Sequence, residues 1–217
     1  NPYHAPGFCE GSAWQFTWYV PHDVKSLINL IGERQFIDRL NAGFATSEKV
    51  SFNALGDNMG AYPINHGNET NMQAAYLFSY TSEPWHTQKW ARAIQEKYYG
   101  MGPRDAYPGD EDQGQMSSWY ILSSIGLFQM DGGCSKDPVW LLGSPRFDRV
   151  EILLDNTYYS GKKLIIKAEN VSKDNCYIQY VRFNNKRLSN NYIEWSKLKK
   201  GGTLHFIMGD RPNPNAF

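Results

Sequence analysis

The sequence has no surplus of charge of either sign and no long apolar run. Its 22 Lys and Arg residues equal its 22 Asp and Glu residues, so no overall field favours a nucleic-acid partner or an anionic membrane surface. No apolar stretch approaches the roughly 20 residues that a membrane-spanning helix needs, and the first residues do not form a signal peptide. We therefore expect a globular chain with no nucleic-acid partner and no membrane span.

Several enzyme motifs are absent as well. Cys9, Cys134 and Cys176 are odd in number and widely spaced, and without a C-x-x-C pair they argue against a zinc or redox site. We expect them to be buried or incidental thiols. There is no G-x-S-x-G, P-loop or G-x-G-x-x-G motif, so serine hydrolase, phosphoryl-transfer and hydride-transfer chemistry have no support.

What the sequence does contain is a short pattern that occurs three times. A Gly-bearing acidic loop is followed at once by an uncharged, aromatic stretch of helical length, at residues 10–12 before 13–20, 67–69 before 72–80, and 109–112 before 114–125. Each loop would place carboxylates at a helix N-terminus, where the dipole favours them. If the three helices lie side by side, the carboxylates converge on one pocket, as an enzyme acting on a neutral polyol or sugar requires.

The first part of the chain has a helical pattern of two kinds. Residues 23–40 and 87–99 have apolar side chains at helical spacing with charged outer faces, whereas 13–20, 72–80 and 116–125 have no charged side chain and should be buried on most sides. The order along the chain is inner, outer, inner, outer, inner. This alternation predicts part of an (α/α)6 toroid of helical hairpins, and a chain that is a piece of a longer one.

After Gly132 and Gly133 the pattern changes to short strands. Residues 150–154, 163–168, 177–183 and 203–208 alternate between polar and apolar side chains, and turn-forming residues separate them. We therefore predict an α+β protein in which a helical catalytic portion, 1–132, is followed by an antiparallel β-sheet or sandwich, 133–217.

The third acidic loop allows more than one interpretation. Asp112 or Gln113 could cap the following helix, but capping needs one carboxylate, whereas Asp110, Glu111 and Asp112 are adjacent and repel one another. The surplus charge could serve a metal ion, a substrate or solvent exposure. Calcium takes carboxylate and carbonyl oxygens, but the ligand pattern of an EF-hand is absent. Calcium ligands, if present, would have to come from distant segments.

Glycoside hydrolysis would use these carboxylates in two roles. An inverting enzyme needs one carboxyl group to protonate the leaving oxygen and another to activate water, about 6.5–9.5 Å apart. A helix N-terminus favours an ionised base, while the acid needs nearby anions or desolvation to stay protonated. We assign Glu10 as the acid and Asp112 as the base, with Asp110 in support.

Histidines supply weaker candidates. His22 and Asp23 could form a catalytic pair, although an adjacent His-Asp before a helix is usually a cap with a neighbouring histidine. His66, just before the middle loop, could contact substrate or only pack.

Four segments of the sequence, taken together, resemble a known family. Residues 10–23 (EGSAWQFTWYVPHD), 67–69 (GNE), 108–120 (PGDEDQGQMSSWY) and 143–148 (GSPRFD) are similar to the signature segments of family-92 glycoside hydrolases. The match runs in order over the whole chain and corresponds to the C-terminal part of such an enzyme. In that family an N-terminal β-sandwich precedes an (α/α)6 catalytic domain.

The resemblance implies a calcium-dependent, inverting exo-α-mannosidase that acts outside the cell or in the periplasm. Carried over by motif, the acid falls on Glu10, the base on Asp112 and the supporting carboxylate on Asp110. Asn68 and Glu69 fall in the segment that approaches calcium and the sugar. The candidates for substrate contact are Trp14, His22, Asp23, His66 and Glu69.

Two features limit what the resemblance implies. Members that cleave α-1,2 linkages tend to have His-Glu three and four residues after the Glu of the middle loop, where this chain has Met72 and Gln73. The rest of the toroid and part of the sugar site would come from upstream sequence of the same polypeptide. The alternative hypothesis is a non-catalytic carbohydrate-binding or structural module, although a pure binder would not need both an acid and a base.

Overall fold

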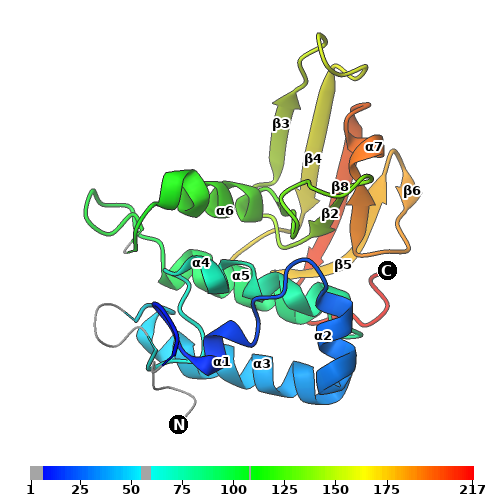
Figure 1. Cartoon of the computed structure of the whole chain (residues 1–217). Coiled ribbons are helices and arrows are strands. Elements are labelled where there is room, and N and C mark those ends of the chain that lie inside the picture. Colours follow the sequence, from blue (N-terminus) through cyan, green and yellow to red (C-terminus); the bar gives the residue numbers. More distant parts are fainter. Residues whose placement is uncertain (1–6, 55–59, 108) are drawn as a thin grey trace.

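The computed structural model describes residues 7–54, 60–107 and 109–217 and has an α+β fold, with helices first and strands after them (Figure 1). The helical elements are α1 (Ala13–Phe16), α2 (Val24–Ile31), α3 (Glu33–Ser47), the 3-10 helix η1 (Glu48–Val50), α4 (Glu69–Met72), the 3-10 helix η3 (Ala74–Tyr80), α5 (Trp85–Lys97), the 3-10 turn η4 (Asp112–Gly114), α6 (Gln115–Ser124) and α7 (Trp195–Leu198). The strands are β1 (Leu127–Phe128), β2 (Val139–Leu142), β3 (Arg149–Leu153), β4 (Lys163–Glu169), β5 (Tyr177–Phe183), β6 (Lys186–Arg187), β7 (Tyr192–Glu194) and β8 (Gly202–Gly209).

The first amphipathic segment folds as two helices instead of the single one predicted. Gly32 separates α2 from α3 with φ 87° and ψ 128°, a backbone conformation that glycine adopts at little cost. Asp23 is the N-cap residue before α2, and its side chain accepts a hydrogen bond from the Ser26 N–H at 3.2 Å. The hydrophobic pattern runs across Gly32 without a break, which is why periodicity alone missed the bend.

The three uncharged segments differ in how much helix they form. The first is helical only in α1, and the second is divided between the single turn α4 and the 3-10 helix η3, whose residues 74–79 are all buried. The third forms α6 as predicted, but Ile121 on that helix keeps 59% of its surface exposed. The expectation of burial on most sides therefore holds for η3 and not for α6.

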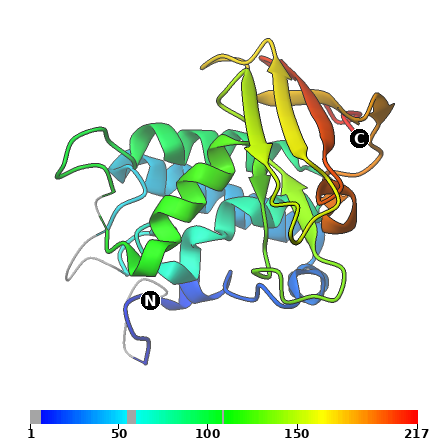
Figure 2. The ribbon, with the colours of Figure 1, turned by 90° about the horizontal axis from the view of Figure 1, so that it is seen from above.

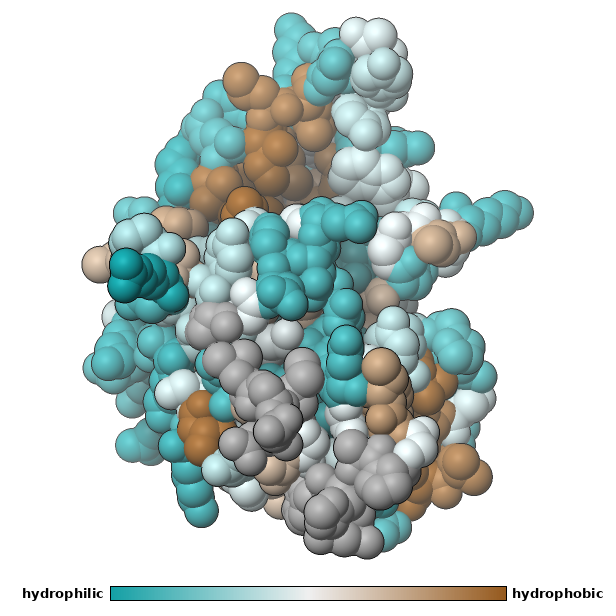
Figure 3. Space-filling model, turned by 60° about the vertical axis from the view of Figure 1, so that its left-hand side comes forward, coloured by the Kyte–Doolittle hydropathy of each residue, from teal (hydrophilic) through white to brown (hydrophobic). Residues whose placement is uncertain are grey.

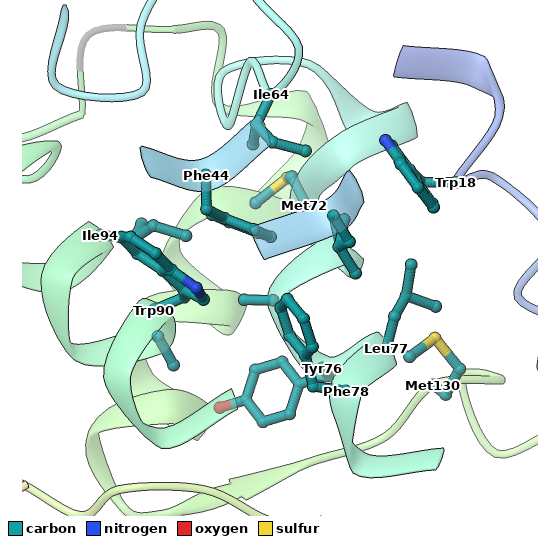
Figure 4. Close-up of a cluster of buried hydrophobic side chains, with 14 of the residues drawn as sticks. Trp18, Phe44, Ile64, Met72, Tyr76, Leu77, Phe78, Trp90, Ile94 and Met130 are labelled. Carbon is teal, nitrogen blue, oxygen red and sulfur yellow. The ribbon is translucent and has the colours of Figure 1, made fainter. Parts of the chain in front are cut away.

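A cluster of buried aromatic and aliphatic side chains joins the helices. Phe44 of α3 stacks on Trp90 of α5 with ring centroids 5.3 Å apart, and the 3-10 helix η3 supplies Tyr76 and Phe78. Figure 4 shows how these side chains meet with Trp18 between the helices. Burying side chains of this size contributes roughly 1.5–3 kcal/mol each, so the cluster fixes the helices from which the acidic loops extend.

The strands form two sheets. The larger has the order β3-β4-β8-β5-β6, and the smaller has the order β1-β2-β7. All neighbouring pairs are antiparallel except β4 and β8, which are parallel. The larger sheet is therefore mixed, whereas the sequence predicted an antiparallel one. Alternating positions of β4, β5 and β8 build a second core with Ile166, Val181 and Phe206 at its centre.

Side chains of α5 connect the helical and β-rich portions. Gln88 accepts a hydrogen bond from the Ile178 N–H at 2.8 Å, and Arg92 donates to the Ser172 carbonyl at 3.0 Å and to the Ser144 hydroxyl at 3.1 Å. The first strand, β1, already begins at Leu127. A division into domains at residues 132 and 133 stays a prediction.

Two expectations from composition concern the whole chain. All three cysteines are free thiols; Cys9 and Cys134 are exposed and Cys176 is half-buried. Within the described parts of the chain, no helix is long and apolar enough to cross a membrane.

Candidate active site

The three acidic loops lie at one end of the helical portion, away from the sheet (Figure 2). In Figure 1 the segment before α1 and the loop before α6 are both on the left-hand side. A hydrogen bond joins the first loop to the middle one, because the Asn68 side-chain amide donates to the Glu10 carbonyl. The first two acidic loops are therefore in direct contact, as the repeated pattern predicted.

The first loop presents Glu10 on a strained backbone. Glu10 has φ 54°, a left-handed conformation that is uncommon for any residue other than glycine, and its side chain is exposed. Gly11 follows without room for a side chain, since a Cβ there would lie 2.7 Å from the ring of Phe16. Strain of this kind persists only where the surrounding structure enforces it, and it is concentrated at functional sites.

The middle loop leads into the single turn of α4. Asn68 is the residue before that turn and is 3% exposed, and Glu69 is its first residue and is half-buried. Asn65 organises the loop behind them: its backbone N–H donates to the Asn71 side chain at 2.9 Å, and its amide exchanges hydrogen bonds with Ala54. These hydrogen bonds of Asn65 thus fix the backbone of the middle loop, which includes Asn68 and Glu69.

The third loop reverses direction immediately before α6. Asp112, Gln113 and Gly114 have φ of 51°, 58° and 97°, three consecutive left-handed residues. Glu111, which sequence reasoning left without a role, accepts the Ser117 N–H at 3.3 Å and so caps α6. The capping residue is therefore Glu111 and not Asp112 or Gln113. The sequence signal for this role is its position four residues before α6, from which a glutamate side chain can reach the free N–H groups of the first turn.

The carboxylates of the three acidic loops repel one another electrostatically. Burial, and then the charges of Glu69, Asp110, Glu10 and Glu111, raise the pKa of Asp112 above its usual range. None of the ion pairs in the described parts of the chain involves these four or Asp112. Figure 3 turns this side toward the viewer and shows hydrophilic residues across its middle. The site is a concentration of uncompensated negative charge.

The direction of this pKa shift differs from the one that the sequence suggests. A helix N-terminus would favour the ionised form of the base, but Asp112 lies in the left-handed turn three residues before α6 begins. Burial and the neighbouring carboxylates raise the pKa of Asp112 at this position. A base with a raised pKa is also a stronger base, which suits proton abstraction near neutral pH.

Two of the predicted substrate contacts are packed into the protein behind the loops. His66 is fully buried, and its Nε2 lies 2.9 Å from the Tyr99 hydroxyl and its ring against Trp119. Burial lowers the pKa of His66 to about 3, so the imidazole is neutral. The ring of Trp14 is half-buried, with the Arg39 guanidinium 5.4 Å from its centroid. Contact of either side chain with a sugar stays a prediction.

The structure places His22 and Asp23 away from the acidic loops. Both are exposed, Asp23 acts as the N-cap of α2, and the Ser26 hydrogen bonds lower its pKa. They line a hollow of about 200 Å³ with Tyr80 and Asp131, and none of the five site carboxylates lines it. Their capping arrangement is the alternative that the sequence left open, and substrate contact at this hollow stays a prediction.

A cavity that the sequence did not indicate adjoins the middle loop. It has a volume of about 340 Å³ and is lined by Glu69, Met72 and Gln73 together with residues of α6 and of the β1 region, among them Trp119 and Phe128. Gln73 donates to the Thr70 carbonyl at 3.0 Å and to the Trp18 carbonyl at 3.3 Å. The two residues that depart from the α-1,2 pattern therefore lie in the wall of a cavity next to Glu69.

Comparison with known proteins shows to which family the chain belongs. The model of the glycosyl hydrolase family 92 catalytic domain matches residues 1–210. The chain belongs to glycosyl hydrolase family 92. Among solved structures of this family, a GH92 α-mannosidase from Bacteroides thetaiotaomicron has a TM-score of 0.84 and 33% identity, covering 100% of this chain and 27% of its own. A GH92 inverting mannosidase from the same organism has a TM-score of 0.80 and 32% identity, over 96% of this chain and 29% of its own.

A relative known from its sequence is longer as well. It is described as an uncharacterized secreted glycosidase of Arthroderma benhamiae, is 29% identical over 203 residues, and aligns with 92% of this chain and 23% of its own length. The family-92 chain thus spans about a quarter of the length of the relatives that it matches, and it corresponds to the C-terminal part of the family domain.

Metal binding by the described side chains alone has little support in the geometry. Among residues 7–54, 60–107 and 109–217, no group of three His, Cys, Asp or Glu side chains is arranged to hold a metal ion. Hard cations nonetheless bind amide and carboxylate oxygens, which Asn68 and Glu69 offer side by side beside an uncompensated negative charge. The donor chemistry of this family-92 site fits calcium, and the number of donors requires further oxygens.

Proposed function

We propose that this chain is the C-terminal part of an exo-acting enzyme that hydrolyses terminal α-linked mannose from glycans by an inverting, calcium-assisted acid/base mechanism. The observation that supports it most directly is the group of carboxylates at one end of the helices, in which four neighbours raise the pKa of Asp112. Membership of a family whose solved relatives include α-mannosidases supports the substrate class.

In this proposal the two ends of the reaction use different carboxyl groups. Glu10 protonates the glycosidic oxygen as the bond to the leaving group breaks. Asp112 takes a proton from a water molecule that attacks the anomeric carbon from the opposite face, which inverts the configuration. Asp110, whose charge reaches Asp112, supports the base. The exposed position of Glu10 and the half-buried position of Asp112 are consistent with groups that meet a substrate from solvent.

Calcium, when bound, supplies a positive charge that can hold two sugar hydroxyls. Asn68 and Glu69 are the residues of this chain that would contribute oxygens to it, and Glu69 would also contact the sugar. The Asn68 amide nitrogen already donates to the Glu10 carbonyl, so its Oδ1 is the atom that remains for a cation. The remaining ligands would come from backbone, water, sugar and the rest of the polypeptide.

The remaining parts of the proposal concern the whole protein. The helical hairpins would form part of an (α/α)6 toroid that upstream segments of the same polypeptide complete, which accords with the exposed face of α6 at Ile121. The secreted relative supports action outside the cell or in the periplasm. We further propose Trp14, His22, Asp23 and His66 as substrate contacts. We also propose that the cavity lined by Met72 and Gln73 influences which mannosidic linkage is cleaved.

Hydrolysis of an aryl α-mannoside and of mannobiosides by the full-length protein tests the proposal. We expect turnover with calcium and its loss with a chelator. We expect Glu10→Gln and Asp112→Asn each to lower kcat/KM by roughly 10²–10⁴-fold, while Asp174→Asn at an exposed site in the β-rich portion leaves it unchanged. No hydrolysis of any mannose linkage in the presence of calcium would contradict the proposal, and mannoside binding without turnover would favour the carbohydrate-binding module.

A further inference from the structure

The phenol oxygen of Tyr98 lies where two of the acidic loops touch. Tyr98 follows α5 and is 3% exposed. A Cβ built on Gly67 would lie 2.6 Å from this oxygen, and a Cβ built on Gly109 would lie 2.7 Å from it. The Gly109 Cβ position is also 3.0 Å from the Gly67 carbonyl oxygen. The two glycines and the hydroxyl are thus in mutual contact.

Each of these glycines stands directly before the acidic residues of its loop. Gly67 precedes Asn68 and Glu69, and Gly109 precedes the segment from Asp110 to Asp112. We propose that Tyr98 is a positioning residue whose hydroxyl sets the separation between the loop of Glu69 and the loop of Asp112. This inference rests on the proposed function, since the separation matters for a reaction that uses these carboxylates.

Packing explains the ring of Tyr98 but not its hydroxyl. The ring lies edge-on to His66 with centroids 4.9 Å apart and edge-on to Tyr99 at 5.1 Å, contacts that a phenylalanine would make equally well. The hydroxyl is buried, and the polar group that it meets is the backbone of Gly109 in the third loop. A hydroxyl that bonds to the third loop and also lies against Gly67 of the middle loop acts as a spacer between them.

The electrostatic surroundings place this spacer next to the catalytic charges. Burial first, and then the charges of Asp112 and Asp110, raise the pKa of Tyr98, so the group is a neutral phenol. A neutral spacer fixes the distance between two negatively charged loops without adding charge of its own. Misplacing a reacting group by about 1 Å can lower a rate by roughly a hundredfold, so a contact of this kind matters for catalysis.

A size exchange tests the spacer directly. Gly67→Ala puts a methyl group 2.6 Å from the hydroxyl oxygen, whereas the next ring atom, Cζ, is 3.5 Å away, which is an ordinary contact. We expect Gly67→Ala to lower kcat about tenfold to a hundredfold with little change in KM, because the loops are pushed apart. The double variant Tyr98→Phe, Gly67→Ala removes the clash and should recover most of that loss. Tyr98→Phe alone should lower kcat several-fold.

The neighbouring glycine provides a matched control. Gly109→Ala would meet the Met116 methyl at 2.8 Å and the Gly67 carbonyl at 3.0 Å as well as the hydroxyl, so Tyr98→Phe should not rescue it. Tyr158→Phe, at a residue 78% exposed on the β3–β4 loop, should leave kcat and KM unchanged. Kinetics of these variants are measured on the full-length protein.

Two outcomes overturn the inference. One is wild-type kcat and KM in Tyr98→Phe, and the other is a double variant no more active than Gly67→Ala. If the wild-type protein hydrolyses no mannoside, the proposed function fails, and the inference is then decided by the midpoints of thermal denaturation of the same variants. Rescue of the Gly67→Ala midpoint by Tyr98→Phe, without rescue of Gly109→Ala, supports the spacer, and lack of rescue overturns it.

Discussion

Asp112 shows at the scale of a single residue how position decides chemistry. Three carboxylates are adjacent in its loop, but Glu111 turns toward α6 as a cap while Asp112 remains half-buried among like charges. Its raised pKa means that a rate depending on ionised Asp112 falls, as the pH decreases, sooner than it would for an ordinary aspartate.

The pH dependence of hydrolysis should therefore respond to Asp110. Removing the negative charge of Asp110 lowers the pKa of Asp112, because that charge is one cause of the upward shift. We expect Asp110→Asn to move the acidic limb of kcat/KM to lower pH, so that the variant keeps a larger fraction of its maximal activity in acid. The measurement is kcat/KM against pH for the full-length protein.

A remote substitution is the control for this prediction. Asp174→Asn also removes one carboxylate, but Asp174 lies in the loop between β4 and β5, outside the group of charges that act on Asp112. It should leave the acidic limb in place. An unchanged or upward-shifted limb in Asp110→Asn would contradict the assignment of Asp112 as the base that Asp110 influences.

At the scale of an element, the end of α6 shows how one glycine connects helix to strand. Gly126 has φ +82° and follows the helix immediately before β1. Its carbonyl accepts the Gly143 N–H at 3.0 Å, and a Cβ on Gly126 would lie 3.0 Å from Pro145. The left-handed residue thus ends α6 and directs the chain into the small sheet.

Stability should depend on this glycine more than on another with positive φ. The left-handed conformation costs an alanine roughly 1–2 kcal/mol, and at Gly126 the contact with Pro145 adds to that cost. Gly132, with φ +59° and nothing within 4 Å of its Cβ position, has the conformational cost alone. We expect Gly126→Ala to lower the midpoint of thermal denaturation more than Gly132→Ala does. Equal midpoints would show that the Pro145 contact relaxes.

At the scale of the whole molecule, α5 holds the helical and β-rich portions together. Arg92 is 5% exposed, and its hydrogen bonds reach two loops of the β-rich portion, at Ser144 and Ser172. Glu96 contributes a charge that acts on the guanidinium, but no ion pair of Arg92 with a carboxylate occurs in the described part of the chain. The charged guanidinium of Arg92 is therefore held by hydrogen bonds to neutral oxygens.

Replacing this arginine should loosen the junction. Arg92→Met leaves the Ser144 hydroxyl and the Ser172 carbonyl without their donor, at a cost of about 1.5–3 kcal/mol for hydrogen bonds to a charged group. We expect a lower midpoint of thermal denaturation in Arg92→Met. Arg92→Lys should lie between Arg92→Met and wild type, because lysine keeps a positively charged donor but lacks the planar, forked set of N–H groups of arginine. Tyr158→Phe, at an exposed residue of the β3–β4 loop, is the control and should retain the wild-type midpoint. A wild-type midpoint in Arg92→Met would rule out this role.

The sequence by itself determined the elements whose pattern is local. Alternation located β3, β4, β5 and β8 within one or two residues, and the apolar face of α5 and the uncharged run of α6 were likewise readable, because burial imposes its period on the residues directly. The repeated acidic loops and their family resemblance also lie in the sequence, since they are short contiguous segments.

Only the tertiary structure decided what depends on residues distant in the chain. The bend at Gly32, the parallel pairing of β4 with β8 and the cap that Glu111 provides for α6 leave the periodicity of the sequence unchanged. The upward pKa shift of Asp112 and the position of the Tyr98 hydroxyl between Gly67 and Gly109 arise from loops that folding brings together. Burial and charge interaction act through space, so no window along the chain contains them.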